Sequence, residues 1–300
     1  MIKINFSYKY LLFFLALIAL ISFSEIGNSA PANNVPRTIP ECTAPISVIA
    51  DCETQPTTQI ITFHKVALCT ALPTEPTGTT ATGLASCVTV FENVAGGAVS
   101  IVRGEGVSPS GTFTDPPYGN YTFAYVELSP VVTYKSNLVF NAAFALSSTA
   151  ANVGNLTAGS SNCQTNGAAY MHMSEPLGGI TCQDGVGVAV NTNVTLNSLD
   201  PNTELYAARF PGTNGNTDVY LVKTNGTLAN GSTQGVNTNV AKLIAFVPMT
   251  ANITPDTTSY DLRYNNTRGM NVYQFNNANG AAKKNIGFSI AYFDLTISVQ

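Results

Sequence analysis

From Ser47 onward, the chain consists of short runs of β-branched and aromatic residues separated by clusters of turn residues. None of these runs has the periodicity of an amphipathic helix. The clearest run is DPPYGNYTFAYVEL, which opens with turn residues and then alternates strictly from Tyr121 to Leu128. Because no helix is expected, the apolar side of such strands has to be buried against other strands. The sequence therefore predicts an all-β fold, an antiparallel β-sandwich built as two β domains or as one extended sandwich.

The alternation places Tyr121, Phe123 and Tyr125 on one side of the predicted strand. Such an aromatic stripe has two interpretations: it packs in the core of the sandwich, or it forms an exposed face on which a ligand stacks. After Ser129–Pro130 a second apolar run, VVTYKSNLVFNAAFAL, begins. Two runs joined by so short a connection are expected to be neighbouring antiparallel strands.

The chain has six cysteines, an even number, at positions 42, 52, 69, 87, 163 and 182. Six cysteines allow many pairings, and the simplest joins neighbours in the sequence: Cys42–Cys52, Cys69–Cys87 and Cys163–Cys182. No Cys-x-x-Cys spacing occurs, so neither a redox pair nor a zinc site is indicated. These residues are interpreted as structural disulfides, which form in an oxidising compartment.

The N-terminus has the three-part layout of a secretory signal peptide. Lys3 and Lys9 are followed by an uncharged apolar run over 11–22 and then by a polar segment that ends in small residues. We expect cleavage after Ala30, no transmembrane segment in the mature chain, and a secreted, periplasmic or cell-surface location. The expected organisation is a signal peptide over 1–30, an extended, proline-rich linker over 31–45, a β-sandwich domain over 46–150 and a second β-rich domain over 151–300.

Part of the first half resembles a known type of module. The runs ITFHKVALC and CVTVFENV, followed by PPYGNYTFAYVEL, are similar to strands of exported transthyretin-like (prealbumin-like) β-sandwich modules, in which a turn of this kind opens a central strand. The chain also resembles uncharacterised exported proteins of marine bacteria. The resemblance covers residues 46–145 at most. It implies a β-sandwich and brings no catalytic residues with it.

The last run, IGFSIAYFDLTISVQ, changes the side on which its apolar residues lie. Phe288, Ile290 and Tyr292 have one parity, whereas Phe293, Leu295 and the apolar residues after them have the other. A regular strand cannot move its apolar face in this way. The sequence therefore predicts a bulge or bend near Tyr292–Phe293.

The stretch AAYMHMSEP places His172 between Met171 and Met173. Thioether and imidazole groups are ligands suited to copper, so these three residues are a candidate metal site. In a strand, however, the methionines and the histidine lie on opposite faces, and the methionines then fill the core. A second stretch, GTNGNTD, places Asn214, Asn216 and Asp218 at alternate positions, either as oxygen ligands for calcium or as an ordinary turn.

No motif of a catalytic site is present. With two histidines, no Gly-x-Ser-x-Gly and dispersed acidic residues, the sequence predicts a protein that is not an enzyme and needs no cofactor. A net charge of −4 without a basic cluster excludes a nucleic-acid groove. The expected function is a structural, assembly or adhesion and recognition role, through self-assembly, another surface protein or a glycan. The alternatives are a glycan-binding module and a copper-binding periplasmic protein.

Overall fold

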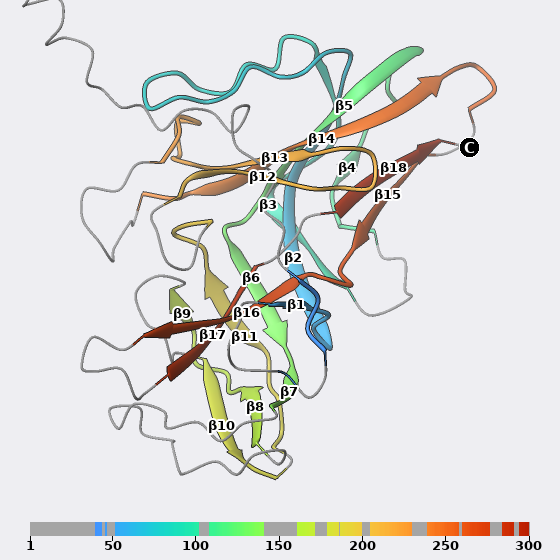
Figure 1. Cartoon of the computed structure of the whole chain (residues 1–300). Coiled ribbons are helices and arrows are strands. Elements are labelled where there is room, and N and C mark those ends of the chain that lie inside the picture. Colours follow the sequence, from blue (N-terminus) through green and yellow to red (C-terminus); the bar gives the residue numbers. More distant parts are fainter. Residues whose placement is uncertain are drawn as a thin grey trace, which may run out of the picture.

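The computed structural model describes residues 40–43, 46, 52–101, 108–140, 161–171, 179–185, 187–199, 205–229, 239–257, 260–276, 284–290 and 294–299 (Figure 1). These residues form strands and no helix, which confirms the predicted all-β class. The strands are β1 (Cys52–Thr54), β2 (Thr58–Cys69), β3 (Cys87–Ile101), β4 (Thr112–Phe113), β5 (Gly119–Leu128), β6 (Val131–Lys135), β7 (Asn137–Phe140), β8 (Ser161–Thr165), β9 (Tyr170–Met171), β10 (Ile180–Asp184), β11 (Thr192–Thr195), β12 (Ala207–Phe210), β13 (Thr217–Val222), β14 (Lys242–Ile253), β15 (Tyr260–Asn265), β16 (Met270–Asn276), β17 (Lys284–Ile290) and β18 (Asp294–Val299).

The long strand β2 organises the largest sheet, which has ten strands. One edge of β2 pairs with β3. On the other edge, the first residues of β2 (Thr58–Ile60) pair with β6 and the later ones (Phe63–Cys69) pair with β5. The prediction that the runs on either side of Ser129–Pro130 are neighbouring strands is therefore wrong. They lie one after the other along the same edge of β2, and their registers differ, with an irregularity between Phe63 and Lys65 of β2.

Because β5 and β6 occupy different parts of the same edge of β2, the sheet continues separately beyond each of them. Beyond β5 it continues as β14, β13 and β12, and beyond β6 it continues as β11 and β9. All pairings in the sheet are antiparallel except the short one between β9 and β11. Strands from both sides of residue 150 thus share one sheet. The predicted domain boundary itself lies outside the described residues.

A second layer packs on one face of the large sheet. It contains the two-stranded sheet β15–β18 and the three-stranded sheet β1–β16–β17. The contact is partly polar, because Gln59 on β2 donates to the Tyr264 hydroxyl at 3.2 Å and the Tyr134 hydroxyl donates to the Gly269 carbonyl at 3.1 Å. The apolar side chains of β2, β5, β13 and β14 are buried in the core. A small sheet of β7, β8 and β10 adjoins the lower end (Figure 1).

The C-terminal run is divided between two sheets. β17 pairs with β16, whereas β18 pairs with β15. Two strands in different sheets account for the change of apolar side in this run, and the predicted bend at Tyr292–Phe293 falls on residues outside those described. The predicted signal peptide and most of the linker also lie outside them. In the part of the chain that the structure describes, no helix is long and apolar enough to cross a membrane.

Candidate functional site

The three disulfides join the sequence-local pairs that were expected: Cys42–Cys52, Cys69–Cys87 and Cys163–Cys182. Cys69 lies directly opposite Cys87 in the β2–β3 pair, and Cys163 lies opposite Cys182 in the β8–β10 pair. Each of these two bonds therefore ties neighbouring strands at one point of their register. The strand pairs, rather than loops alone, are what the disulfides hold together.

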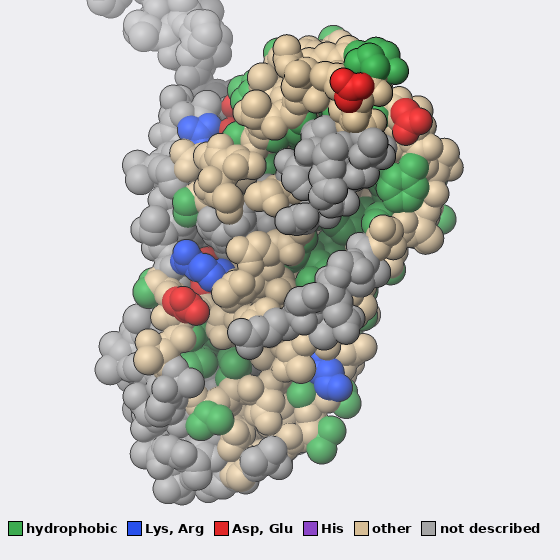
Figure 2. Space-filling model, turned by 90° about the vertical axis from the view of Figure 1, so that its right-hand side faces the viewer, with side chains coloured by type: hydrophobic (Ala, Val, Ile, Leu, Met, Phe, Trp, Pro, Cys, Tyr) green, Lys and Arg blue, Asp and Glu red, His purple; other side chains and the backbone are tan. Residues whose placement is uncertain are grey.

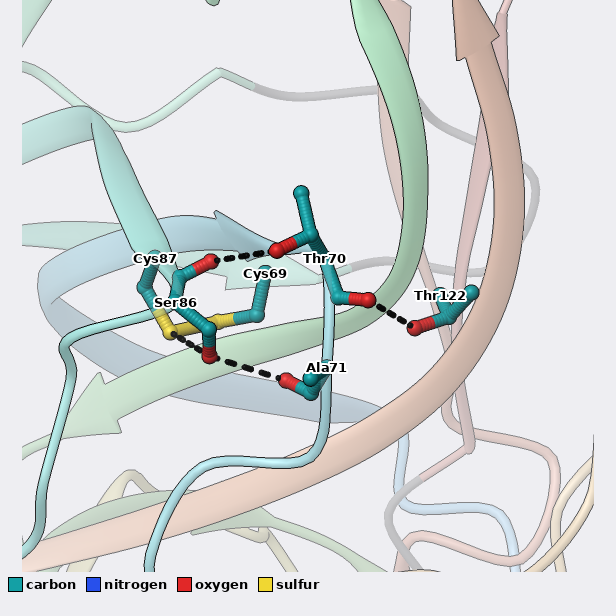
Figure 3. The surroundings of a disulfide bond; sticks show 6 residues. All are labelled: Cys69, Thr70, Ala71, Ser86, Cys87 and Thr122. Atoms are coloured by element: carbon teal, nitrogen blue, oxygen red, sulfur yellow. Dashed lines mark hydrogen bonds between the residues drawn. A yellow bond between two sulfur atoms is a disulfide. The ribbon is translucent and has the colours of Figure 1, made fainter.

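The Cys69–Cys87 bond closes loop 70–86 (Figure 3). Beside the bond, the Thr70 hydroxyl donates to the Ser86 carbonyl at 3.3 Å and the Ser86 hydroxyl donates to the Ala71 carbonyl at 3.1 Å. The Thr122 hydroxyl on β5 donates to the Thr70 carbonyl at 3.1 Å. These bonds fix the base of the loop against the large sheet.

The far part of loop 70–86 lies against the turn that follows β13. The Leu228 amide donates to the Thr77 carbonyl at 2.8 Å, and Ala81 forms a bridge with Thr227. Gly226 in that turn has φ +80°, and a Cβ there would lie 3.2 Å from the Ala81 side chain. Only glycine adopts this conformation at low cost. Loop 70–86 is thus an ordered cover that reaches across β13.

Four polar residues meet where this loop crosses the sheet: Arg209 on β12, Asp218 and Tyr220 on β13, and Glu75 on the loop. Arg209 lies directly opposite Asp218 and binds it through two bonds, Nε–Oδ1 at 2.6 Å and Nη2–Oδ2 at 2.7 Å. Tyr220 has the same parity as Asp218, and its ring packs 5.0 Å from that of Phe246. The four groups interact electrostatically, and we take this cluster as the candidate site.

The site shifts the pKa values of its members. Burial raises the pKa of the Glu75 carboxyl above its ordinary value, the Asp218 charge adds to this, and the interactions with Tyr220 and Arg209 oppose it. Burial also raises the pKa of the Tyr220 hydroxyl, and the charges of Glu75 and Asp218 add to the effect. Hydrogen bonds to Asp218 raise the pKa of Arg209. Burial therefore acts together with the neighbouring charges to keep Tyr220 protonated.

The Tyr220 hydroxyl is buried and makes no hydrogen bond of normal length and angle. Glu75 is accordingly a weakly bonded partner of this hydroxyl, in a geometry outside the normal range. The Asp218 carboxylate and the Arg209 guanidinium are occupied by each other. The arrangement can hold protons and fix the loop, but it presents no activated nucleophile and no free cation for an anionic substrate.

The aromatic stripe of β5 is divided between the core and its margin. Tyr121 and Tyr125 are buried in the core, and Phe123 is partly buried against it. The Tyr121 hydroxyl donates to the Pro117 carbonyl at 2.8 Å, and the Tyr125 hydroxyl donates to Glu127 at 3.0 Å. Burial raises the pKa of Tyr125, and the charge of Glu127 adds to the shift. The hydroxyls of both tyrosines are used inside the protein.

The remaining candidate residues have different outcomes. Met171 ends β9, which pairs with β11, whereas His172 and Met173 lie outside the described residues. Asp218 of the candidate calcium stretch binds Arg209, while Asn214 and Asn216 are exposed in the turn before it. In the described ranges, no group of three or more His, Cys, Asp or Glu side chains is placed to hold a metal ion.

Glu75, Arg209 and Tyr220 were not singled out by sequence reasoning. Arg209 and Asp218 flank a turn in two predicted strand runs, and this spacing is a signal that could have paired them. Nothing in the sequence places Glu75 beside Tyr220, because 145 positions separate the two residues in the numbering.

No protein-family model, curated protein or solved structure matches this chain. The resemblance to transthyretin-like modules therefore stays a prediction.

Proposed function

We propose that this chain is an exported, non-enzymatic protein of the cell surface or periplasm, with a structural and recognition role. The observation that supports the proposal most directly is how its charged groups are used. Four ion pairs each join two structural elements: Lys65–Glu92, Arg209–Asp218, Lys242–Glu127 and Arg268–Glu53. These ion pairs join neighbouring parts of the fold, as the disulfides do.

The proposal depends on where these ion pairs lie in the fold, rather than on how many there are. Lys65–Glu92 joins β2 to β3, Lys242–Glu127 joins β14 to β5, and Arg268 reaches Glu53 on β1, whose side chain is almost fully buried. A catalytic site needs charged groups that are free to act on a substrate. Here the charged groups with the lowest exposure neutralise one another across strand pairs, which favours a role carried out by surfaces.

Export is the first part to test. Residues 1–30 and, separately, residues 31–60 are fused in front of a phosphatase that becomes active only after its disulfides form outside the cytoplasm. We expect activity from the first fusion and none from the second. An inactive first fusion would contradict the proposed location.

The role is tested on the oxidised mature chain, residues 31–300, by light scattering, by electron microscopy and by binding to a glycan array. Assembly into filaments or sheets supports a mainly structural role, whereas a monomer that binds glycans supports recognition. A monomer that binds nothing on the array and turns over a substrate in a broad hydrolase screen would sink the proposal.

A further inference from the structure

One corner of the large sheet combines an exposed aromatic ring with side-chain amides that make no hydrogen bond. β5 begins at this corner and β14 ends there, as the upper right of Figure 1 shows. Phe113 and Tyr118, in the segment that leads into β5, are 54% and 71% exposed. They are the only exposed large aromatic side chains among the described residues, whereas the aromatic residues of the following strand turn into the core.

The segment that carries these rings is held in place from several sides. The buried Tyr121 donates its hydroxyl to the Pro117 carbonyl at 2.8 Å, next to Tyr118. The Thr114 amide donates to the Val90 carbonyl at 3.0 Å, and the ring of Phe113 lies 5.1 Å from that of Phe91. A ligand that binds here does not have to order the segment first, which lowers the entropic cost of binding.

Two asparagines face each other beside Tyr118. Asn120 on β5 is the register partner of Asn252 on β14, and both side chains are exposed. Directly opposed residues of an antiparallel pair have Cβ atoms roughly 5 Å apart. In the part of the chain that the structure describes, neither side-chain amide makes a hydrogen bond. The pair therefore offers two carbonyl acceptors and two NH₂ groups to a ligand.

The charges at this corner select the kind of ligand. Asp115 and Asp256 are exposed, and neither 108–123 nor 249–257 contains a Lys or Arg. Figure 2 looks onto this side of the molecule and shows acidic and hydrophobic side chains at its upper right, whereas the Lys and Arg side chains lie at the upper left and lower down. An anionic ligand such as a phosphate or a uronate is disfavoured there, because no cation is present to balance its charge.

We propose that Tyr118, with Asn120 and Asn252, forms a binding site for a neutral carbohydrate. The phenol ring packs against the apolar C–H face of a pyranose, and the two amides hydrogen-bond its neighbouring hydroxyls. A protein partner is less suited to this corner, because such interfaces need far more buried area than two rings supply. This inference rests on the recognition part of the proposed function and gives it a ligand class.

The test measures binding of the oxidised mature chain to immobilised neutral polysaccharides (mannan, dextran and β-1,3-glucan), with the anionic polysaccharide alginate as comparison. We expect saturable binding to at least one neutral polymer and weaker binding to alginate. Tyr118→Ala should weaken binding about tenfold, since it removes the stacking surface, and Asn120→Ala with Asn252→Ala by a similar factor. Tyr118→Phe keeps the ring and should stay within about threefold.

Matched controls are Val188→Ala, which truncates a residue that is 84% exposed elsewhere, and Asn214→Ala, which removes an exposed amide in another turn. Both should bind as the unchanged protein does, and thermal unfolding should show that every variant is folded. The site is overturned if no neutral polymer binds, or if Tyr118→Ala binds as tightly as Val188→Ala. These failures leave the export test above unaffected.

Asn120 and Asn252 also stand in Asn-x-Thr sequons, so the mass of the protein from its own source has to be measured. We expect both amides to be unmodified. A glycan attached covalently to either residue would occupy the amide and would overturn the proposed site.

Discussion

Two ion pairs of the large sheet occupy equivalent register positions but have different surroundings. Arg209 and Asp218 are direct register partners on β12 and β13, and Lys65 and Glu92 are direct register partners on β2 and β3. The nitrogen–oxygen distances are similar, at 2.6 Å and 2.9 Å. The acidic side chain is 6% exposed in the first pair and 49% exposed in the second.

The difference shows what loop 70–86 does. Its Glu75 acts electrostatically on both Arg209 and Asp218, and the loop contacts Thr227 and Leu228 just beyond β13, so we infer that it covers the first pair. The acidic side chain of the second pair faces water. Water screens an exposed pair until little stabilisation remains, whereas a covered pair is costly to break. The large sheet therefore carries one covered ion pair, Arg209–Asp218, and one exposed pair, Lys65–Glu92, and we attribute the difference to loop 70–86.

The largest expected effect comes from opening the loop. In the double variant Cys69→Ser/Cys87→Ser, the unfolded chain gains freedom and the loop loses its closed base. The free energy of unfolding should fall by about 3 kcal/mol. Chemical denaturation followed by tyrosine fluorescence measures this. An unchanged midpoint would mean that the hydrogen bonds at the base hold the loop without the disulfide.

The second effect concerns the covered pair itself. Asp218→Asn keeps the shape of the side chain but leaves Arg209 opposite a neutral group in a covered place, and it should cost about 2 kcal/mol. Glu92→Gln is the matched control and should change stability by less than about 0.5 kcal/mol. Equal costs in the two variants would remove the distinction between the pairs. In the Cys69→Ser/Cys87→Ser background, the loss of unfolding free energy caused by Asp218→Asn should fall toward that caused by Glu92→Gln.

A third prediction compares two buried hydroxyls. The Tyr134 hydroxyl donates to the Gly269 carbonyl, whereas the Tyr220 hydroxyl beneath the loop has no bond of normal geometry. Tyr134→Phe should therefore cost about 1 kcal/mol, and Tyr220→Phe should cost less than about half of that. Denaturation curves of the two variants side by side decide the point. A larger loss at Tyr220 would show that its hydroxyl is firmly bonded to Glu75.

The smallest effect is a pH dependence from Glu75. Its pKa is raised above 4.5 in the folded protein, so the folded state binds a proton more tightly than the unfolded state does. This contribution is present at low pH and is lost as the pH rises through the folded pKa. Glu75→Gln should remove it, so the variant should lose less stability than the parent between pH 4.5 and neutrality.

The measurement is a series of urea midpoints across that range, with Glu41→Gln as the control, because Glu41 is exposed. Parallel curves for the parent and Glu75→Gln would show that Glu75 is solvated and that the loop does not cover the pair closely.

Sequence reasoning recovered the features that depend on neighbouring residues. The alternation from Tyr121 to Leu128 is β5, and the three disulfides follow the sequence-local pairing. It failed where a distant segment intervenes: the two runs around Ser129–Pro130 do not pair with each other because β2, far earlier in the chain, pairs with both. Alternation shows which side of a strand is apolar, but it does not show which strand will lie beside it.

The same limit applies to the sites. The pattern singled out Tyr121, Phe123 and Tyr125, yet two of these rings are buried. Among the residues that the structure describes, the exposed large aromatic side chains are Phe113 and Tyr118, which precede them. The Asn120–Asn252 pair and the approach of Glu75 to Tyr220 each join residues more than a hundred positions apart. Local periodicity and loop closure determined an all-β, disulfide-linked chain from the sequence alone. Which residues share a sheet corner or lie beneath a loop depends on long-range strand pairing, and the tertiary structure alone decided that.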